Sequence, residues 1–314
     1  MKHKVTTEQV DTFLDRQLAV WPMAEGNFKA LEKVKVKEID MDGMKIKVQF
    51  NPARIVSSSA KVDAKSLKER KCFLCEENRP DVQIGIEWGE EGKYIILINP
   101  FPIFPRHFTI PDRSHVDQLV VDRIEDMMDL ARDMEGYTVF YNGPKCGASA
   151  PDHMHFQAGN SDFLTLAEAI ENSELKVIEE TVDKASLSLV DTLPLKVFVI
   201  DAVDHAEGAK LFRKLYDALP VPEGEKEPMM NLLCYVTPAG TRLVVIPRKK
   251  HRPSFYGMEN EDQKLISPAS VDMGGVFITP LEKDFEKFNK DTALKIFEEL
   301  CLSSNEINEI ASKL

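Results

Sequence analysis

The chain has 314 residues, 43% of them hydrophobic, and its formal net charge at pH 7 is −12. The length and apolar content suffice for two domains or for one duplicated domain. The negative charge excludes broad electrostatic binding to nucleic acid or to an anionic membrane, so a phosphate-bearing ligand must meet a local group of Lys and Arg side chains. The N-terminus leads into polar sequence and no apolar run approaches a membrane span, which predicts a cytoplasmic protein. Five cysteines, an odd number, argue against a disulfide framework.

The first part of the chain alternates helix, hairpin and strand signals. The expected elements are, in chain order, a short helix after Thr6, a hairpin over 38–50 with its turn at Asp42-Gly43, a buried strand over 94–98 that stops at Asn99-Pro100, a strand over 108–111, a helix over about 119–135, a strand over 138–141, a loop over 142–152 and a strand over 153–157. Local hairpins in this order favour an antiparallel α+β fold over a doubly wound one.

The pattern restarts after about residue 185, with a strand over 196–200, a helix over 206–218 and strands over 231–236 and 242–246. The run Val245–His251 echoes Phe108–His115, which indicates a duplication. The second half lacks any His-x-His or Cys-x-x-Cys, so we expect it to be a degenerate, supporting copy. We therefore divide the chain into a catalytic half, residues 1–185, and a second half with C-terminal helices, residues 186–314.

Two imidazoles and a carboxamide stand at alternate positions of one short run, at His153, His155 and Gln157. In an extended strand these side chains share one face, while Met154 and Phe156 enter the core. A histidine left neutral near pH 7 is a competent nucleophile or general base. Gln157 can donate a hydrogen bond to a phosphoryl oxygen but cannot supply a proton, so it suits a leaving group that departs unprotonated.

A thiol pair, Cys72 and Cys75, lies upstream of this strand. Such a pair is compatible with two buried thiols, with a redox pair or with a metal site. The surrounding sequence is not a strand running into a helix of a thioredoxin-like unit, and His115 and His153 supply imidazoles. We therefore favour zinc, and four protein ligands would make the metal structural rather than catalytic.

Several motifs together resemble the histidine-triad superfamily: Asn99-Pro100-Phe101-Pro102, the run over 105–111, His115 and the His-x-His-x-Gln strand. The most similar branch comprises galactose-1-phosphate uridylyltransferase, diadenosine tetraphosphate phosphorylase and GDP-hexose phosphorylase. The resemblance covers roughly residues 70–160 well and the remainder loosely. It implies a HIT-like antiparallel sheet with helices, duplicated here with a degenerate second half.

The resemblance also implies roles for single residues. In that branch the second histidine of the motif attacks the α-phosphorus to give a nucleotidyl-histidine, which corresponds to His155. The first histidine, two cysteines and a histidine after the preceding strand bind zinc in the uridylyltransferases, which corresponds to the set His153, Cys72, Cys75 and His115. A strand-end Asn or Asp holds the ribose, which corresponds to Asn99. Hydrolases of the superfamily usually carry a third histidine in place of Gln157, so a transferase or phosphorylase is favoured.

One departure concerns the phosphate-binding serine. The family pattern is Ser-x-x-His-x-His, whereas one extra residue separates Ser149 from His153. Asn142, Gly147 and backbone amides of the loop are therefore further candidates for the phosphate. Cationic groups must also offset the phosphates; the candidates are Arg54, Arg106, Lys145, Arg248, Lys249 and Arg252, with the cluster at 248–252 favoured.

These observations predict a nucleotidyltransferase or nucleoside-diphosphate-sugar phosphorylase with a covalent intermediate at His155. The alternatives are a dinucleoside polyphosphate phosphorylase or hydrolase, and a zinc-stabilised nucleotide-binding module without turnover. The expected partners are a nucleotide or nucleotide sugar and a phosphate or sugar phosphate, without nucleic acid or membrane. The sequence leaves a homodimer open, as it does the base and the sugar.

Overall fold

The computed structural model describes residues 1–55, 59 and 63–314. Its largest element is a sheet of 11 strands, every neighbouring pair of which is antiparallel. The strands are β1 (Lys2–His3), β4 (Ile86–Glu90), β5 (Tyr94–Ile98), β6 (His107–Pro111), β7 (Tyr137–Asn142), β8 (His155–Asn160), β9 (Lys176–Thr181), β10 (Ala185–Val190), β11 (Val197–Ala202), β12 (Met230–Thr237) and β13 (Gly240–Pro247). The predicted antiparallel α+β fold is confirmed.

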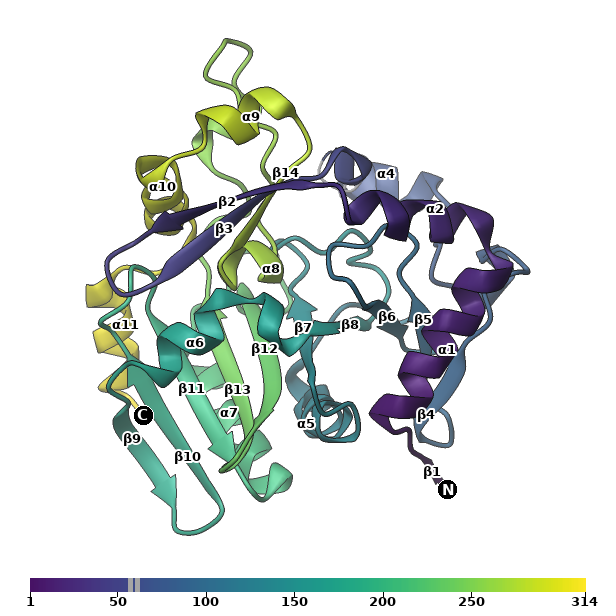
Figure 1. Ribbon diagram of the computed structural model, residues 1–314. Coiled ribbons are helices and arrows are strands. Elements are labelled where there is room, and N and C mark those ends of the chain that lie inside the picture. Colours follow the sequence, from purple (N-terminus) through teal and green to yellow (C-terminus); the bar gives the residue numbers. More distant parts are fainter. Residues whose placement is uncertain (56–58, 60–62) are drawn as a thin grey trace.

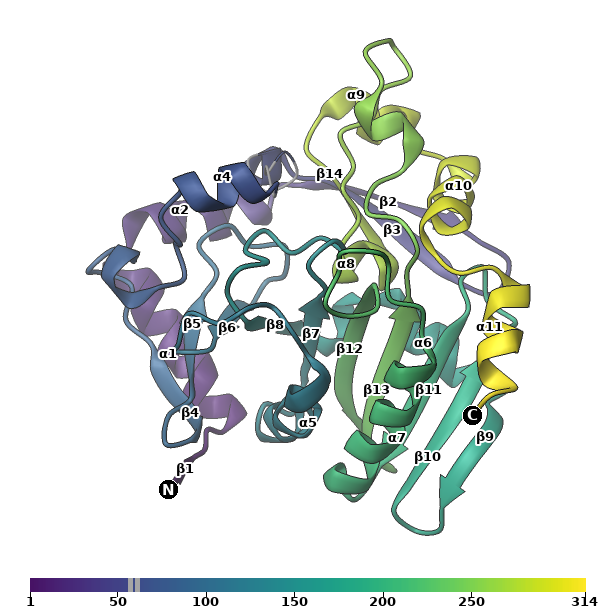
Figure 2. The ribbon, with the colours of Figure 1, turned by 180° about the vertical axis from the view of Figure 1, so that it is seen from behind.

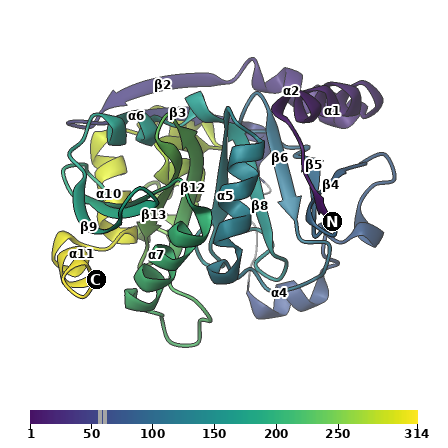
Figure 3. The same cartoon turned by 90° about the horizontal axis from the view of Figure 1, so that it is seen from below.

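The strand order shows the duplication directly. It is β1-β4-β5-β6-β8-β7-β12-β13-β11-β10-β9, so the series β4-β5-β6-β8-β7 is repeated in reverse by β9-β10-β11-β13-β12. Helix α5 (Ile124–Asp133) connects toward β7, and α7 (His205–Ala218) takes the same place before β12. The halves meet where β7 pairs with β12. Figure 3 shows α5 and α7 side by side, and both pack against the same face of the sheet.

This topology corrects the repeat expected from sequence. The run Val245–His251 belongs to β13 and its end, whose counterpart is β8, not β6. The similarity to Phe108–His115 therefore does not reflect the duplication. On β13, Val244 and Ile246 are fully buried among apolar neighbours. The second copy has apolar side chains on its strand and no His-x-His, as expected of a degenerate half.

Two hydrophobic cores lie on opposite faces of the sheet, because successive strand residues point to opposite sides. One core joins the sheet to α1 (Thr7–Val20), α5 and α7. The other lies under a small sheet of β2 (Lys35–Asp40), β3 (Lys45–Phe50) and β14 (Val276–Thr279), and it includes buried side chains of α10 (Lys290–Leu300). Figures 1 and 2 show this small sheet across the top of the second half. The N-terminal hairpin thus covers the C-terminal half of the chain.

Local sequence explains the N-terminal elements. The predicted helix after Thr6 is α1, and Thr6 and Gln9 form a reciprocal capping box at its start. The predicted hairpin is β2 and β3; Asp42 and Gly43 in its turn both have positive φ, as a tight hairpin turn requires.

The other α-helices within the described residues are α2 (Pro22–Leu31), α4 (Ala64–Glu69), α6 (Thr165–Glu171), α8 (Ser270–Met273), α9 (Glu282–Lys287), α10 (Lys290–Leu300) and α11 (Ser304–Ala311). Among the described residues, none of the helices combines the length and the apolar character that crossing a bilayer requires.

Candidate active site

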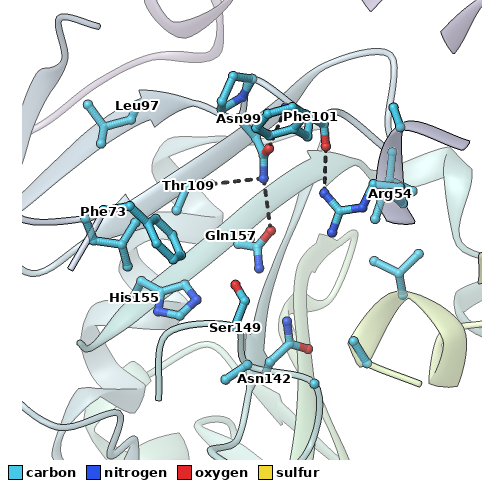
Figure 4. Close-up of a pocket in the computed structure, with 18 of the residues that line it drawn as sticks. Arg54, Phe73, Leu97, Asn99, Phe101, Thr109, Asn142, Ser149, His155 and Gln157 are labelled. Atoms are coloured by element: carbon cyan, nitrogen blue, oxygen red, sulfur yellow. Dashed lines mark hydrogen bonds between the residues drawn. The ribbon is translucent and has the colours of Figure 1, made fainter. Parts of the chain in front are cut away.

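A cavity of about 570 Å³ opens where the two halves meet. Its walls come from β5, β6, β7 and β8 of the first half and from residues 251–278 of the second half. Eight of the predicted site residues line it, namely Arg54, Asn99, Asn142, Gly147, Ser149, His155, Gln157 and Arg252. Figure 4 labels all of these except Gly147 and Arg252. Asn99 and Gln157, which lie 58 positions apart in the sequence, are therefore brought together at one site.

His155 is the first residue of β8 and is almost completely buried. Its Nδ1 lies 2.8 Å from the backbone oxygen of His153. Because a carbonyl oxygen only accepts, Nδ1 carries the proton and Nε2 keeps its lone pair. Burial lowers the pKa of His155 to about 4, so the ring is neutral. The arrangement yields an imidazole with one unprotonated nitrogen at the cavity.

The carboxamide of Gln157 is oriented by His107, a residue that the sequence reasoning missed. The backbone N–H of Ile103 donates to Nδ1 of His107 over 3.1 Å, so the ring proton must reside on Nε2. Nε2 then donates to Oε1 of Gln157 over 3.0 Å, and Nδ2 of Asn99 approaches the same oxygen at 3.4 Å. Two donors thus engage the oxygen of Gln157. Its NH2 group is left as a donor toward the cavity (Figure 4).

Asn142 is held in a comparable way, from the second half. The backbone N–H of Ser270, at the start of α8, donates to Oδ1 of Asn142 over 2.7 Å, and Nδ2 of Asn231 approaches that oxygen at 3.3 Å. A backbone N–H can only donate, so the atom that it meets is the oxygen. The amide nitrogen of Asn142 faces the cavity beside Ser149 (Figure 4). Two carboxamides therefore offer N–H donors beside the imidazole of His155.

Cys72, Cys75, His115 and His153 form a cluster that could hold a metal ion, with all four ligand atoms within 4.8 Å of one another. The distances to Nδ1 of His153 are 3.3 Å from Sγ of Cys72 and 3.6 Å from Sγ of Cys75. A tetrahedral zinc ion holds its sulfur and nitrogen ligands roughly 3.3–3.8 Å apart. Nε2 of His153 donates to the backbone oxygen of Asp112 over 2.7 Å, which leaves Nδ1 free of a proton. The residues fit the metal.

His153 does not lie on the strand with His155 and Gln157, as the alternation predicted. Strand β8 begins at His155, and His153 lies in the turn before it. The turn directs Nδ1 of His153 to the thiols. The metal cluster and the cavity thus share this turn, because the carbonyl that accepts from His155 belongs to His153.

Two family models match the chain, one over the first half and one over the second. Residues 13–160 match a family model described as a domain of unknown function, DUF4922, and residues 169–314 match one described as GDPGP1-like, C-terminal domain. A comparison with curated protein sequences gives no significant match.

Crystal structures of yeast Ap4A phosphorylase Apa2 have the same architecture over nearly the whole chain. In one structure of Apa2 the match covers 90% of this chain and 94% of the Apa2 chain, at 18% identity and TM-score 0.56. In the complex of Apa2 with AMP the match covers 91% of this chain and 96% of the Apa2 chain, at 17% identity and TM-score 0.58. In the complex with Ap4A it covers 90% and 97% of the two chains, at 17% identity and TM-score 0.59. The predicted histidine-triad-like fold is confirmed.

Two arginines predicted for phosphate binding do not reach the cavity of this histidine-triad-like fold. Arg106 pairs with Asp11 of α1 at 3.2 Å. Arg248 is almost completely buried, and its guanidinium donates to Oδ1 of Asn231 over 2.6 Å and to three backbone oxygens. Arg248 therefore fixes the orientation of the Asn231 side chain and does not contact the cavity. The predicted cluster at 248–252 reaches the cavity through His251 and Arg252 instead.

Other cations line the cavity, and one of them was foreseen. Arg54 donates from Nη1 to the backbone oxygen of Phe101 over 2.7 Å (Figure 4). Burial lowers its pKa to about 10, so it remains charged. Arg70 lies beside the metal cluster, where it pairs with Asp152 at 2.5 Å. The chain as a whole is negatively charged, but these two guanidinium groups place positive charge near the imidazole of His155.

The role of His107 could have been found from the strand signals. Strand β6 pairs with β8 so that Thr109 lies opposite Gln157 and His107 opposite Gly159. Alternate residues of β6 therefore share the face of His155 and Gln157. The histidine-triad motif contains His153, His155 and Gln157, and it does not include His107.

Proposed function

We propose that the protein transfers a nucleotidyl group through a covalent bond to Nε2 of His155, as a nucleoside-diphosphate-sugar phosphorylase or hexose-1-phosphate nucleotidyltransferase. The observation that carries the proposal is the protonated Nδ1 of His155 on the backbone oxygen of His153, which leaves Nε2 with a lone pair at a cavity lined by amide donors. The match to the GDPGP1-like model and the motif resemblance to GDP-hexose phosphorylases support a nucleotide sugar as donor.

The reaction would proceed in two displacements. The lone pair of Nε2 attacks the α-phosphorus, the P–N bond forms, and the P–O bond to the sugar phosphate breaks with its electron pair on the leaving oxygen. Inorganic phosphate or a sugar phosphate then attacks the same phosphorus, and the P–N bond breaks. A phosphate leaving group is stable as an anion, so no general acid is needed. Gln157, which cannot give up a proton, suits this step.

The amide donors would stabilise the developing charge. Negative charge builds up on the phosphoryl oxygens in the transition state, and donors that are already oriented are worth more than mobile ones. Gln157 is oriented by His107 and Asn99, and Asn142 by Ser270 and Asn231. Ser149 and Gly147 line the same wall, and Asn99 would hold the ribose by the family correspondence.

We further propose zinc at Cys72, Cys75, His115 and His153, where it would be structural because four protein ligands leave no open position. Bound zinc would supply a fixed cross-link between the loop at 72–75 and the turn before β8. His153 would then hold its backbone oxygen in place for His155. No chemical step passes through the metal.

The second candidate is a dinucleoside polyphosphate phosphorylase or hydrolase. It is favoured by the architecture shared with yeast Ap4A phosphorylase Apa2, which has been crystallised with AMP and with Ap4A. A third reading, a zinc-stabilised nucleotide-binding module without turnover, differs from both in forming no covalent intermediate.

One assay panel separates these candidates. Purified protein is incubated with GDP-, UDP- and ADP-sugars and with diadenosine tetraphosphate, each alone, with inorganic phosphate and with a hexose 1-phosphate, and the products are resolved by chromatography. The first proposal is supported by phosphate-dependent release of a nucleoside diphosphate from a nucleotide sugar, or by transfer of its nucleotidyl group to the hexose 1-phosphate. The second is supported by cleavage of diadenosine tetraphosphate alone, with or without phosphate. If the protein binds these donors but yields no product from any of them, both enzyme proposals are contradicted and the nucleotide-binding module without turnover is supported.

A further inference from the structure

Gln118 is a fully buried polar residue in the extended segment between β6 and α5, and the mechanism above does not use it. Its carboxamide forms hydrogen bonds with both backbone groups of His155, the N–H and the carbonyl. The N–H of His155 donates to Oε1 of Gln118 over 2.8 Å, and Nε2 of Gln118 donates to the carbonyl of His155 over 3.1 Å. The same Nε2 donates to the carbonyl of Asn142 over 3.0 Å. One side chain thus engages the backbone of two residues that face the cavity.

The position of these bonds in the sheet explains their effect. Strands β7 and β8 pair from Tyr137↔Asn160 to Phe140↔Gln157, and the pairing ends there. If this register continued, Tyr141 would lie opposite Phe156 and Asn142 opposite His155. The carboxamide of Gln118 bridges this second pair in place of direct strand pairing. The carboxamide thus makes the backbone hydrogen bonds that a neighbouring strand would make, to β8 at His155 and to β7 at Asn142. It satisfies backbone groups that would otherwise be buried without partners, and it separates the two strands where the cavity begins.

The second half of the chain holds this segment in place. The hydroxyl of Tyr141 lies 3.0 Å from the backbone oxygen of Gln118 and 2.5 Å from Oε1 of Glu227. The N–H of Val120 donates to Oε2 of Glu227 over 3.0 Å. Glu227 precedes β12 and is almost completely buried. A contact from the degenerate half therefore reaches the nucleophile strand through Gln118.

We propose that Gln118 is a positioning residue for the nucleotidyl-transfer step, an inference that rests on the proposed function. Its carboxamide holds the backbone of His155 so that Nδ1 meets the carbonyl of His153 and Nε2 faces the donor phosphate. Loss of this support shifts the imidazole without removing it. A displacement of about 1 Å at a reacting group is enough to cost about 100-fold in rate.

The test compares Gln118→Glu with Gln17→Glu. Gln118→Glu is isosteric and keeps an acceptor for the N–H of His155, but it sets a carboxylate oxygen against the two carbonyls. Gln17 is equally buried and engages the backbone in the same way, since its Nε2 donates to Val82 over 2.8 Å and its Oε1 accepts from Ile84 over 2.9 Å. It lies outside the cavity lining, so Gln17→Glu reproduces the loss of stability alone.

Two readouts are measured at a temperature where both variants are folded. The first is the single-turnover rate of covalent labelling with α-³²P-labelled nucleotide donor, together with the KM for that donor. The account predicts that Gln118→Glu labels about 100-fold more slowly with KM changed little, while Gln17→Glu labels at the wild-type rate. Wild-type labelling by Gln118→Glu, or equal slowing in both variants, overturns the proposal.

The second readout is the tautomer of His155 by long-range ¹H–¹⁵N NMR, which needs no activity. The Nδ1–H form is expected in wild type and in Gln17→Glu, and a mixture of tautomers in Gln118→Glu. An unchanged Nδ1–H form in Gln118→Glu contradicts the positioning role. If wild type takes no label from any donor, the proposed function fails, while the tautomer still decides the role of Gln118. Should Gln118→Glu not fold, Tyr141→Phe is measured instead, and an unaltered labelling rate and tautomer overturn the proposal.

Discussion

His107 and Gln157 form one hydrogen-bonded unit, in which Nε2 of His107 donates to Oε1 of Gln157 over 3.0 Å. Burial, and then the nearby charge of Arg54, lower the pKa of His107 to about 3, so the ring stays neutral over the whole working range of pH. The N–H of Ile103 fixes its tautomer. A neutral histidine with no route to the substrate phosphate other than Gln157 is well suited to orientation and poorly suited to proton transfer.

The first prediction concerns His107→Phe, which keeps an aromatic ring and removes both hydrogen bonds. Gln157 is then free to turn its oxygen toward the cavity, and kcat for nucleotidyl transfer should fall about 10- to 100-fold. The matched control is His205→Phe, because His205 is also buried and hydrogen-bonded, to Asp129 and Thr241, but does not line the cavity. Both variants should lose stability, and only His107→Phe should lose kcat. Steady-state kinetics on folded protein check this; equal kcat values in the two variants would refute the role of His107.

The second prediction concerns Asn142→Asp. The aspartate can still accept from the N–H of Ser270, but it replaces an amide donor with a carboxylate that faces the phosphates. Repulsion between like charges should raise the KM for the nucleotide donor by at least about 10-fold. Asn160→Asp is the control, since Asn160 likewise accepts a backbone N–H, from Arg106, and lies outside the cavity lining. A KM for Asn142→Asp that equals that of the control would contradict the assignment.

The third prediction concerns the metal. Elemental analysis of the purified protein should find about one zinc per chain, and Cys75→Ser should lose it. Removal of the metal should lower the Tm, because the ligands come from three separate stretches of the chain. Cys301→Ser should keep the metal, since Cys301 is buried far along the chain beside Met273. Full zinc content in Cys75→Ser would show that the cluster does not bind it.

The fourth prediction is a pH dependence of stability that is assigned to Glu227. Burial raises its pKa to about 7, against an ordinary value of 4.5. The folded state therefore binds more protons than the unfolded state between these values, and the free energy of unfolding falls as the pH rises through this window. The full contribution is about 3 kcal/mol. Relative to Glu227→Gln, the wild type should be more stable near pH 4.5 than near pH 7.5. Denaturant titrations at several pH values check this, and parallel curves for the two proteins would exclude Glu227 as the source.

The sequence predicted the chemical groups better than it predicted their orientation. Alternation along β8 and the Cys-x-x-Cys pair indicated which side chains share a site, because strand period and ligand spacing are local properties. The orientation of Gln157 and Asn142 depends on His107 and on Ser270, which lies 128 residues from Asn142. Long-range contacts of this kind leave no local pattern.

The arginines show a second limit. A positive charge in the sequence does not reveal the direction of its side chain, and Arg106 turns to Asp11 while Arg248 turns to Asn231. The similarity between Val245–His251 and Phe108–His115 was also misleading. These short similar sequences lie on β13 and β6, which are not equivalent strands of the two halves. The division of the chain at residue 185 and the roles of the individual site residues remain predictions.

The most direct test of the account is covalent labelling of His155. Wild type, His155→Ala and the control His251→Ala are incubated with α-³²P-labelled nucleotide donor without phosphate, quenched in alkali and mapped by mass spectrometry. The account predicts an acid-labile nucleotidyl group on His155 in wild type and in His251→Ala, none in His155→Ala, and release of the label when phosphate is added. Full transfer activity in His155→Ala, or a label on another residue, would contradict it.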